Sequence, residues 1–138
     1  MMRIGATIIL TLIMAIPVDA PLLRVAKVVP LGFTIASWYG AKYQGRLTAS
    51  GEPFDRFAAT CAHPGLPFGT RLRLYNAATN RFARCRVTDR GPFCEFPGSQ
   101  WFSCSQRRGL DTSEGVAELL GFREQGLARL EVALLLPD

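Results

Sequence analysis

Two acidic residues and a histidine lie in short segments of this chain that are rich in glycine and proline. Asp89 lies in Val-Thr-Asp-Arg-Gly-Pro-Phe (87–93), Glu52 lies in Thr-Ala-Ser-Gly-Glu (48–52), and His63, the single histidine, directly precedes a proline. Cleaving a glycosidic bond needs a proton for the leaving oxygen and negative charge near the developing oxocarbenium ion. Two carboxylates in different environments meet both needs. The pattern therefore indicates a glycan-cleaving site.

Each of these residues also has a plain structural interpretation. A strand-end aspartate such as Asp89 often accepts backbone N–H bonds in a turn. Glu52 taken alone is an exposed loop glutamate, although Gly51 and Pro53 on either side restrict how the backbone presents it. A lone histidine is more often a hydrogen-bonded structural residue than a catalyst, yet His63 can titrate near neutral pH.

Five short motifs, taken together, resemble the RlpA (rare lipoprotein A) family, whose domain is a double-psi β-barrel. In chain order they are Ala-Ser-Trp-Tyr-Gly (36–40), Thr-Ala-Ser-Gly-Glu (48–52), Ala-His (62–63), Leu-Pro-Phe-Gly-Thr (66–70) and Val-Thr-Asp-Arg-Gly-Pro-Phe (87–93). The resemblance runs from about residue 35 to about residue 132, in the family's order. It implies a mainly β fold, a small six-stranded double-psi β-barrel with one or two short helices.

The resemblance also implies an activity, that of an endolytic peptidoglycan lytic transglycosylase. Such an enzyme cleaves the MurNAc-GlcNAc bond and forms 1,6-anhydro-MurNAc, because the C6 hydroxyl of the sugar replaces water as nucleophile. One acid can then protonate the leaving group and act as base, with no metal or cofactor. On this reading Asp89 is the acid and base, Glu52 is its electrostatic partner and His63 orients the site or contacts substrate.

Two other classes of function remain open. One is a non-hydrolytic, expansin-like module that binds carbohydrate or loosens the cell wall through the same groove. The other is a disulfide-stabilised inhibitor or toxin-like protein that uses the barrel only as a scaffold. For the second class, removing the carboxylates of Glu52 and Asp89 would leave function unchanged.

Five further residues are candidate substrate contacts. Trp38 and Tyr39 could form a sugar-stacking surface, although a strand tryptophan more often packs in the core. Ser50 belongs to one of the five motifs. Arg90 and Arg108 could bind substrate carboxylates bidentately, or pair with Asp111 and its neighbours.

The cysteines indicate disulfides rather than a metal site. There are four, an even number, with one histidine and no Cys-x-x-Cys pair. Residues alternate around Cys85 so that it should face the core, and we predict the pairs Cys61 with Cys85 and Cys94 with Cys104. The second pair lies in an insertion that precedes Leu-Asp-Thr-Ser (110–113) and could reshape or cap the substrate groove.

The start of the chain is typical of an export signal. Residues 1–20 are expected to be a signal peptide or, because Pro21 disfavours cleavage, an uncleaved N-terminal anchor. The apolar run from 4 to 16 is shorter than the roughly 20 residues of a membrane span. Residues 21–32 read as a linker and 33–138 as the barrel domain. We expect an exported, periplasmic or extracellular protein that is not a lipoprotein, since the leader has no cysteine.

The formal net charge of +5 suits a polyanionic neighbourhood such as a cell wall. The simpler interpretation is that Arg71, Arg73, Arg84 and Arg86 form the solvated faces of two strands. Nucleic-acid binding is not expected, because no matching set of exposed aromatic residues is evident. The expected partner is the peptidoglycan glycan strand, and the expected state is a monomer without a stable membrane span after leader cleavage.

Alternation and turn residues predict the elements that carry these groups. We expect a first strand over 33–39, a loop over 40–57 that carries Glu52, and a hairpin that pairs 71–75 with 82–88. A helix over 113–120 should be capped by a serine and ended by a glycine, and a last strand should follow over 127–135. Asp89 then lies at the end of the second hairpin strand.

Overall fold

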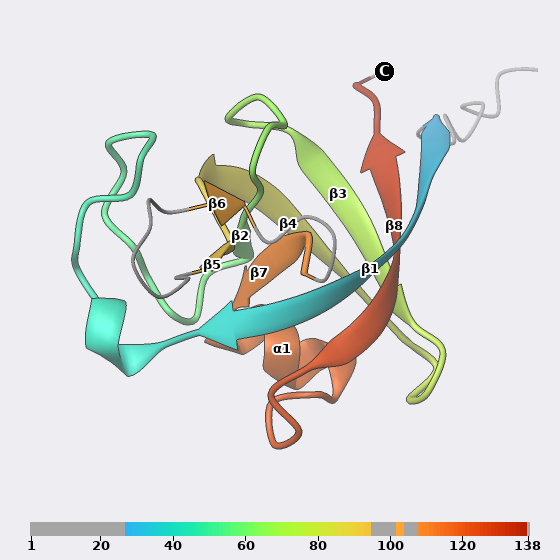
Figure 1. Ribbon diagram of the computed structural model, residues 1–138. Coiled ribbons are helices and arrows are strands. Elements are labelled where there is room, and N and C mark those ends of the chain that lie inside the picture. The colour runs from blue at the N-terminus through green and yellow to red at the C-terminus, as the bar shows by residue number, and fades with distance from the viewer. Residues whose placement is uncertain (1–26, 95–101, 104–107, 138) are drawn as a thin grey trace, which may run out of the picture.

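The computed structural model describes residues 27–94, 102–103 and 108–137. Within these residues, six strands close into a barrel in the order β1-β7-β2-β4-β3-β8, with one short α-helix beside it (Figure 1). This is the mainly β, six-stranded barrel that the sequence predicted. None of the helices in the described part of the chain is long and apolar enough to cross a membrane. The expected leader, residues 1–20, lies outside the described residues.

The barrel strands are β1 (Val28–Tyr39), β2 (Thr60–Ala62), β3 (Arg71–Asn76), β4 (Arg81–Asp89), β7 (Leu110–Ser113) and β8 (Ala128–Leu135). Two of the pairings are parallel, β1 with β7 and β2 with β4, and the others are antiparallel. The remaining elements are the 3-10 helix η1 (Ala41–Tyr43), the helix α1 (Glu114–Leu120) and a separate ribbon of β5 (Phe93–Cys94) with β6 (Phe102–Ser103).

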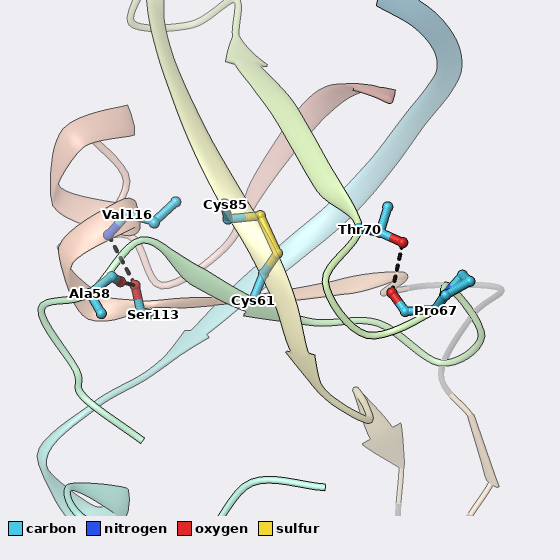
Figure 2. Close-up of a disulfide and its surroundings, with 7 residues drawn as sticks. All are labelled: Ala58, Cys61, Pro67, Thr70, Cys85, Ser113 and Val116. Atoms are coloured by element: carbon cyan, nitrogen blue, oxygen red, sulfur yellow. Dashed lines mark hydrogen bonds between the residues drawn. A yellow bond between two sulfur atoms is a disulfide. The ribbon is translucent and has the colours of Figure 1, made fainter. Parts of the chain in front are cut away.

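The predicted hairpin and helix are confirmed. β3 pairs antiparallel with β4 across the connection that follows Asn76. α1 begins after Ser113, whose Oγ accepts a hydrogen bond from the backbone N–H of Val116 at 3.3 Å and donates one to the carbonyl of Ala58 (Figure 2). Gly121 ends the helix in the left-handed region at φ 75°.

The predicted start of the first strand at residue 33 is wrong, because the strand begins earlier, within the segment 21–32 that was expected to be a linker. β1 starts at Val28, which pairs with Leu135 of β8. The register shifts between Pro30 and Gly32. A bulge tolerates a residue without an N–H, so the proline and glycine that suggested a linker are accommodated within the strand. Two short strands, β2 and β7, were not predicted because their few residues are mostly small or polar.

A disulfide between Cys61 and Cys85 joins β2 to β4 inside the core (Figure 2). Both residues are buried, and this pairing confirms the prediction. Around them lie fully buried apolar side chains from several strands and from the helix region, among them Leu72, Leu74, Val87, Leu110, Leu130 and Phe122. The predicted pair of Cys94 with Cys104 lies outside the described residues, since Cys104 and the side chain of Cys94 are not among them.

Candidate active site

The short strand β2 brings two carboxylates to the same place. Ala62 of β2 pairs with Asp89 at the end of β4 on one side and with Asp111 of β7 on the other. Both aspartates line one pocket of about 440 Å³, together with Tyr39, Tyr43 and further residues of the 46–54 loop. Asp89 was predicted from its motif to be catalytic, whereas Asp111 was not. The signal that could have found Asp111 is its place in the Leu-Asp-Thr-Ser segment after the insertion.

The turn over 48–52 holds the carboxylate of Asp89. Its Oδ1 accepts hydrogen bonds from the backbone N–H of Ala49 at 2.9 Å and of Arg90 at 2.8 Å. The turn itself is held against β4, because the N–H of Ser50 donates to the carbonyl of Thr88 at 3.1 Å. Two N–H donors stabilise a negatively charged carboxylate. The motif that contains Ser50 therefore orients the carboxylate of Asp89.

Asp111 lies in a different environment. Its Oδ1 accepts a hydrogen bond from Ser37 Oγ, which in turn accepts one from Arg108 Nη1 at 3.3 Å. Burial raises the pKa of Asp111 above its ordinary value of 3.8, and the nearby charge of Asp89 raises it further, while Ser37 and Arg108 act in the opposite direction. The pair thus combines one carboxylate that accepts two backbone N–H bonds with one whose pKa is raised by burial.

The carboxylate of Glu52 is not among the groups that line this pocket. It is half-exposed and pairs with Arg86 Nη1 through both oxygens, at 2.8 and 3.1 Å. Its backbone carbonyl accepts a hydrogen bond from Thr48 Oγ1 at 2.8 Å. Glu52 therefore shares the turn that orients Asp89, but its charge points to Arg86 of β4 rather than to the two aspartates.

His63 contacts the backbone of Asp89. Its backbone N–H donates to the carbonyl of Asp89 at 3.2 Å, and its Nδ1 accepts the N–H groups of Gly65 at 3.0 Å and Leu66 at 2.9 Å. Burial lowers the pKa of His63 below its ordinary value of 6.5, and the charge of Arg90 lowers it further. Its side chain lines a second, mainly apolar pocket of about 420 Å³. A neutral imidazole in this position organises the 63–66 turn.

The aromatic candidates occupy different positions. Tyr39 lines the pocket of the two aspartates and stacks on Phe54 with ring centroids 4.3 Å apart. Its hydroxyl is buried and has no hydrogen-bond partner among the described residues. Burial, followed by the charges of Asp89 and Asp111, raises its pKa. Trp38 packs against the core, as its structural interpretation predicted, and its Nε1 donates to a backbone carbonyl at 3.0 Å.

The polar candidates are engaged with neighbouring groups of the protein. Arg90 donates through Nη1 to the carbonyls of Leu66 at 2.9 Å and His63 at 3.3 Å, and its guanidinium lies over the ring of Phe68 at 3.9 Å. Ser50 Oγ lies 2.9 Å from the hydroxyl of Thr48. Of the arginines predicted to contact substrate, Arg108 lies on the Ser37 and Asp111 side of the site.

No group of three or more His, Cys, Asp or Glu side chains in the described ranges is arranged to hold a metal ion. The chemistry of the pocket, as the described residues form it, is that of two carboxylates at its base with aromatic rings beside them.

Comparison with known proteins identifies the family. A family model described as lytic transglycolase matches residues 34–132. The chain belongs to this family. Its domain is the RlpA-like double-psi β-barrel that the five motifs implied.

Curated relatives of this lytic transglycolase domain carry consistent names. The probable endolytic peptidoglycan transglycosylase RlpA of Synechocystis sp. is 37% identical over 73% of this chain and 28% of the relative. The endolytic peptidoglycan transglycosylases RlpA of Neisseria meningitidis and Pseudomonas aeruginosa are 36% and 38% identical over 74% and 70% of this chain, and over 38% and 25% of the relatives. The chain thus spans between about a quarter and two fifths of the length of these relatives.

Solved structures share the fold of this lytic transglycolase domain. The apo expansin of Clavibacter michiganensis superimposes with a TM-score of 0.56 at 19% identity, over 78% of this chain and 51% of the expansin. A mutant of that expansin in complex with cellohexaose gives a TM-score of 0.55 at 17% identity. At this level of identity the likeness establishes the fold alone.

Proposed function

We propose that this domain is an endolytic peptidoglycan lytic transglycosylase that cleaves the MurNAc-GlcNAc bond and leaves a 1,6-anhydro-MurNAc end. One observation carries the proposal: Asp89 and Asp111 flank Ala62 and line the same pocket in two different environments. The names of the curated relatives support the same activity. Peptidoglycan glycan strands are then the substrate.

The environments of the two aspartates favour separate roles as general acid and general base. Asp111, whose pKa is raised, donates its proton to the glycosidic oxygen as the bond to C1 of MurNAc breaks. The carboxylate of Asp89 stabilises the positive charge that develops at the ring, and it takes the proton from the C6 hydroxyl as the oxygen of that hydroxyl attacks C1. Proton transfer from Asp89 back to Asp111, directly or through water, restores the site. The sequence had assigned both tasks to Asp89.

The other predicted residues have supporting roles in this proposal. Glu52 holds the 48–52 turn through its ion pair with Arg86 and its carbonyl, so it acts on Asp89 through that turn. His63 keeps the backbone of Asp89 in place through its N–H. Tyr39 presents an aromatic ring to the pocket that receives the sugar.

The test is mass spectrometry of peptide-free glycan strands after incubation with the disulfide-intact full chain. We expect products with 1,6-anhydro ends, which disappear with Asp89→Asn or Asp111→Asn. Asp55→Asn is the matched control, because Asp55 is exposed, lies outside the pocket lining and uses its oxygen only to accept the N–H of Phe57. This control should cleave like the unchanged chain.

The remaining outcomes separate the competing functions. Products with reducing ends would mean that water is the nucleophile. Uncleaved strands that co-sediment with the protein would indicate an expansin-like binding module. Uncleaved strands that do not bind would favour a scaffold of the inhibitor or toxin class.

The proposed substrate places the protein outside the cytoplasm, in the periplasm or at the cell exterior. The disulfide between Cys61 and Cys85 supports an oxidising compartment. We also propose that the domain is a monomer, because β1 pairs with β8 and the barrel leaves no open edge that needs a second chain. Sedimentation equilibrium of the purified chain tests this, and a dimer mass would contradict it.

A further inference from the structure

The outer face of the β3–β4 hairpin carries four arginines, Arg71, Arg73, Arg84 and Arg86, which we call the arginine ladder. The register places Arg71 opposite Arg86 and Arg73 opposite Arg84. Cross-strand neighbours lie about 5 Å apart at Cβ, and like charges in this position destabilise a sheet. The four residues alternate with buried Leu72, Leu74, Ala83 and Cys85, so their side chains share the outer face. The hairpin therefore keeps an unfavourable arrangement of charges.

Two carboxylates of the described residues lie by this face, Glu52 and also Glu131 of β8, which pairs opposite Tyr75, two residues along β3 from Arg73. Of these two, only Glu52 is in an ion pair with the ladder, through Arg86. The next side chains along the face are an aromatic pair, Tyr75 and Phe82, stacked at 4.3 Å. Phe82 is 57% exposed, and the guanidinium of Arg73 lies 5.5 Å from the centre of its ring. A face that served only solubility would be more stable with mixed charges.

The ladder begins at the edge of the candidate active site. Its first rung contacts Glu52 of the 48–52 turn, and the same turn donates the N–H that holds Asp89. The second rung, Arg73 with Arg84, lies two residues farther along each strand, about 7 Å away. A polymer that leaves the pocket over this turn would meet Arg86, which is paired with Glu52, and then the second rung of Arg73 and Arg84.

We propose that the arginine ladder is a second binding surface, which holds the carboxylates of stem peptides on intact peptidoglycan while the pocket receives the glycan. The charge complementarity and the continuity with the pocket support this occupant. A guanidinium binds a carboxylate through two parallel N–H bonds, which suits repeated carboxylates along a polymer. The choice of polymer rests on the proposed function.

The test is co-sedimentation with insoluble peptidoglycan at low salt, using the full chain with Asp89→Asn so that binding is measured without cleavage. In this background, Arg73→Gln with Arg84→Gln should weaken apparent binding about twentyfold. The charge-matched control is Arg81→Gln with Arg129→Gln, two exposed arginines outside the ladder. The control should change binding less than about twofold, and the ladder variant should melt no lower than the parent, because it removes one pair of like charges.

The second arm uses peptidoglycan whose carboxylates have been converted to methylamides. Binding of the parent should fall to the level of the ladder variant, and the difference between the two should vanish. A ladder variant that binds native peptidoglycan as tightly as its control would overturn the proposal. A loss that persists unchanged on the amidated polymer would also overturn it, because the occupant would then not be a carboxylate.

A third measurement separates this proposal from the proposed function. The ladder substitutions, placed in the chain with Asp89 intact, should leave cleavage of short peptide-free strands unchanged. If the unchanged chain cleaves nothing but the ladder effect on binding persists, the transglycosylase proposal fails and the ladder stands. If the chain cleaves and the ladder variant binds like its control, the ladder proposal alone fails.

Discussion

The pocket of Asp89 and Asp111 and the arginine ladder both place like charges side by side, and β4 contributes to both. In the pocket, burial raises the pKa of Asp111, which favours a proton on this carboxyl and so lowers the repulsion. On the ladder, arginine cannot release its proton, and the repulsion is left to water, salt or a bound anion. Burial of the side chains therefore decides what neighbouring like charges can do. Buried carboxyls can shift their pKa, whereas exposed guanidinium groups stay charged and available to an anion.

The largest expected effect is on catalysis in the pocket. Asp89→Asn and Asp111→Asn should each lower the rate of 1,6-anhydro product formation by about 10²- to 10⁴-fold, the range of general acid–base catalysis. The Arg73→Gln, Arg84→Gln pair should leave this rate unchanged on short strands. Initial rates on peptide-free strands measure all three. Full activity of Asp111→Asn would show that Asp89 performs both proton transfers, as the sequence alone suggested.

The second effect concerns the disulfide between Cys61 and Cys85, which links β2 at the pocket to β4 of the ladder. Replacing both Cys61 and Cys85 by alanine should lower the free energy of unfolding by about 3 kcal/mol, the value for a disulfide that closes a loop of 24 residues. Urea unfolding of oxidised parent and double variant measures this. The disulfide ties β2, which positions both aspartates, to β4. The double variant should therefore lose more of its cleavage rate than of its peptidoglycan binding through the ladder. An equal loss of both would contradict the view that the disulfide supports mainly the pocket.

The third effect is the pH dependence of stability. Because the pKa of Asp111 is raised above 3.8 by burial, the folded chain keeps a proton that the unfolded chain has released. The stability contributed by this group is full below about pH 3.8 and is lost as pH rises through the raised folded pKa. Asp111→Asn removes this loss, so the variant gains stability relative to the parent as pH rises.

Urea titrations of parent and Asp111→Asn across about pH 4 to 8 measure this difference. The Arg73→Gln, Arg84→Gln pair is the comparison, and its difference from the parent should be flat with pH because arginine stays protonated. A flat difference for Asp111→Asn would mean that burial does not raise the pKa of this carboxyl.

The smallest effect is on the ladder itself. Arg84→Glu places a carboxylate opposite Arg73 and should raise the free energy of unfolding by about 0.5 kcal/mol at low salt, an effect that salt screens. Arg81→Glu, opposite Asn76, should give no such gain. Thermal melting at two salt concentrations measures both. If Arg84→Glu destabilised the chain at low salt, the cross-strand repulsion that supports the ladder proposal would be absent.

The short-range sequence pattern correctly predicted the elements whose conformation is set by residues close together in the chain. Strict alternation identified the β3–β4 hairpin, and the capping serine and terminal glycine identified α1. Alternation also predicted that Cys85 faces the core, where it forms a disulfide with Cys61. These predictions hold because a strand's period and a helix's ends are set by the residues themselves. The start of β1 was missed, because its proline and glycine are typical of a linker and only pairing with β8 makes them part of a strand.

Five motifs in order along the chain were enough to predict the family, the barrel class and Asp89 as a site residue. The second carboxylate of the pocket becomes evident only from the pairing of the strands. Three residues of β2 lie between β4 and β7, and this places Asp111, beyond the insertion, across Ala62 from Asp89. Glu52 belongs to one of the five motifs, but its carboxylate pairs with Arg86. The physical reason is that strand pairing, rather than spacing along the chain, sets which charges share a buried pocket.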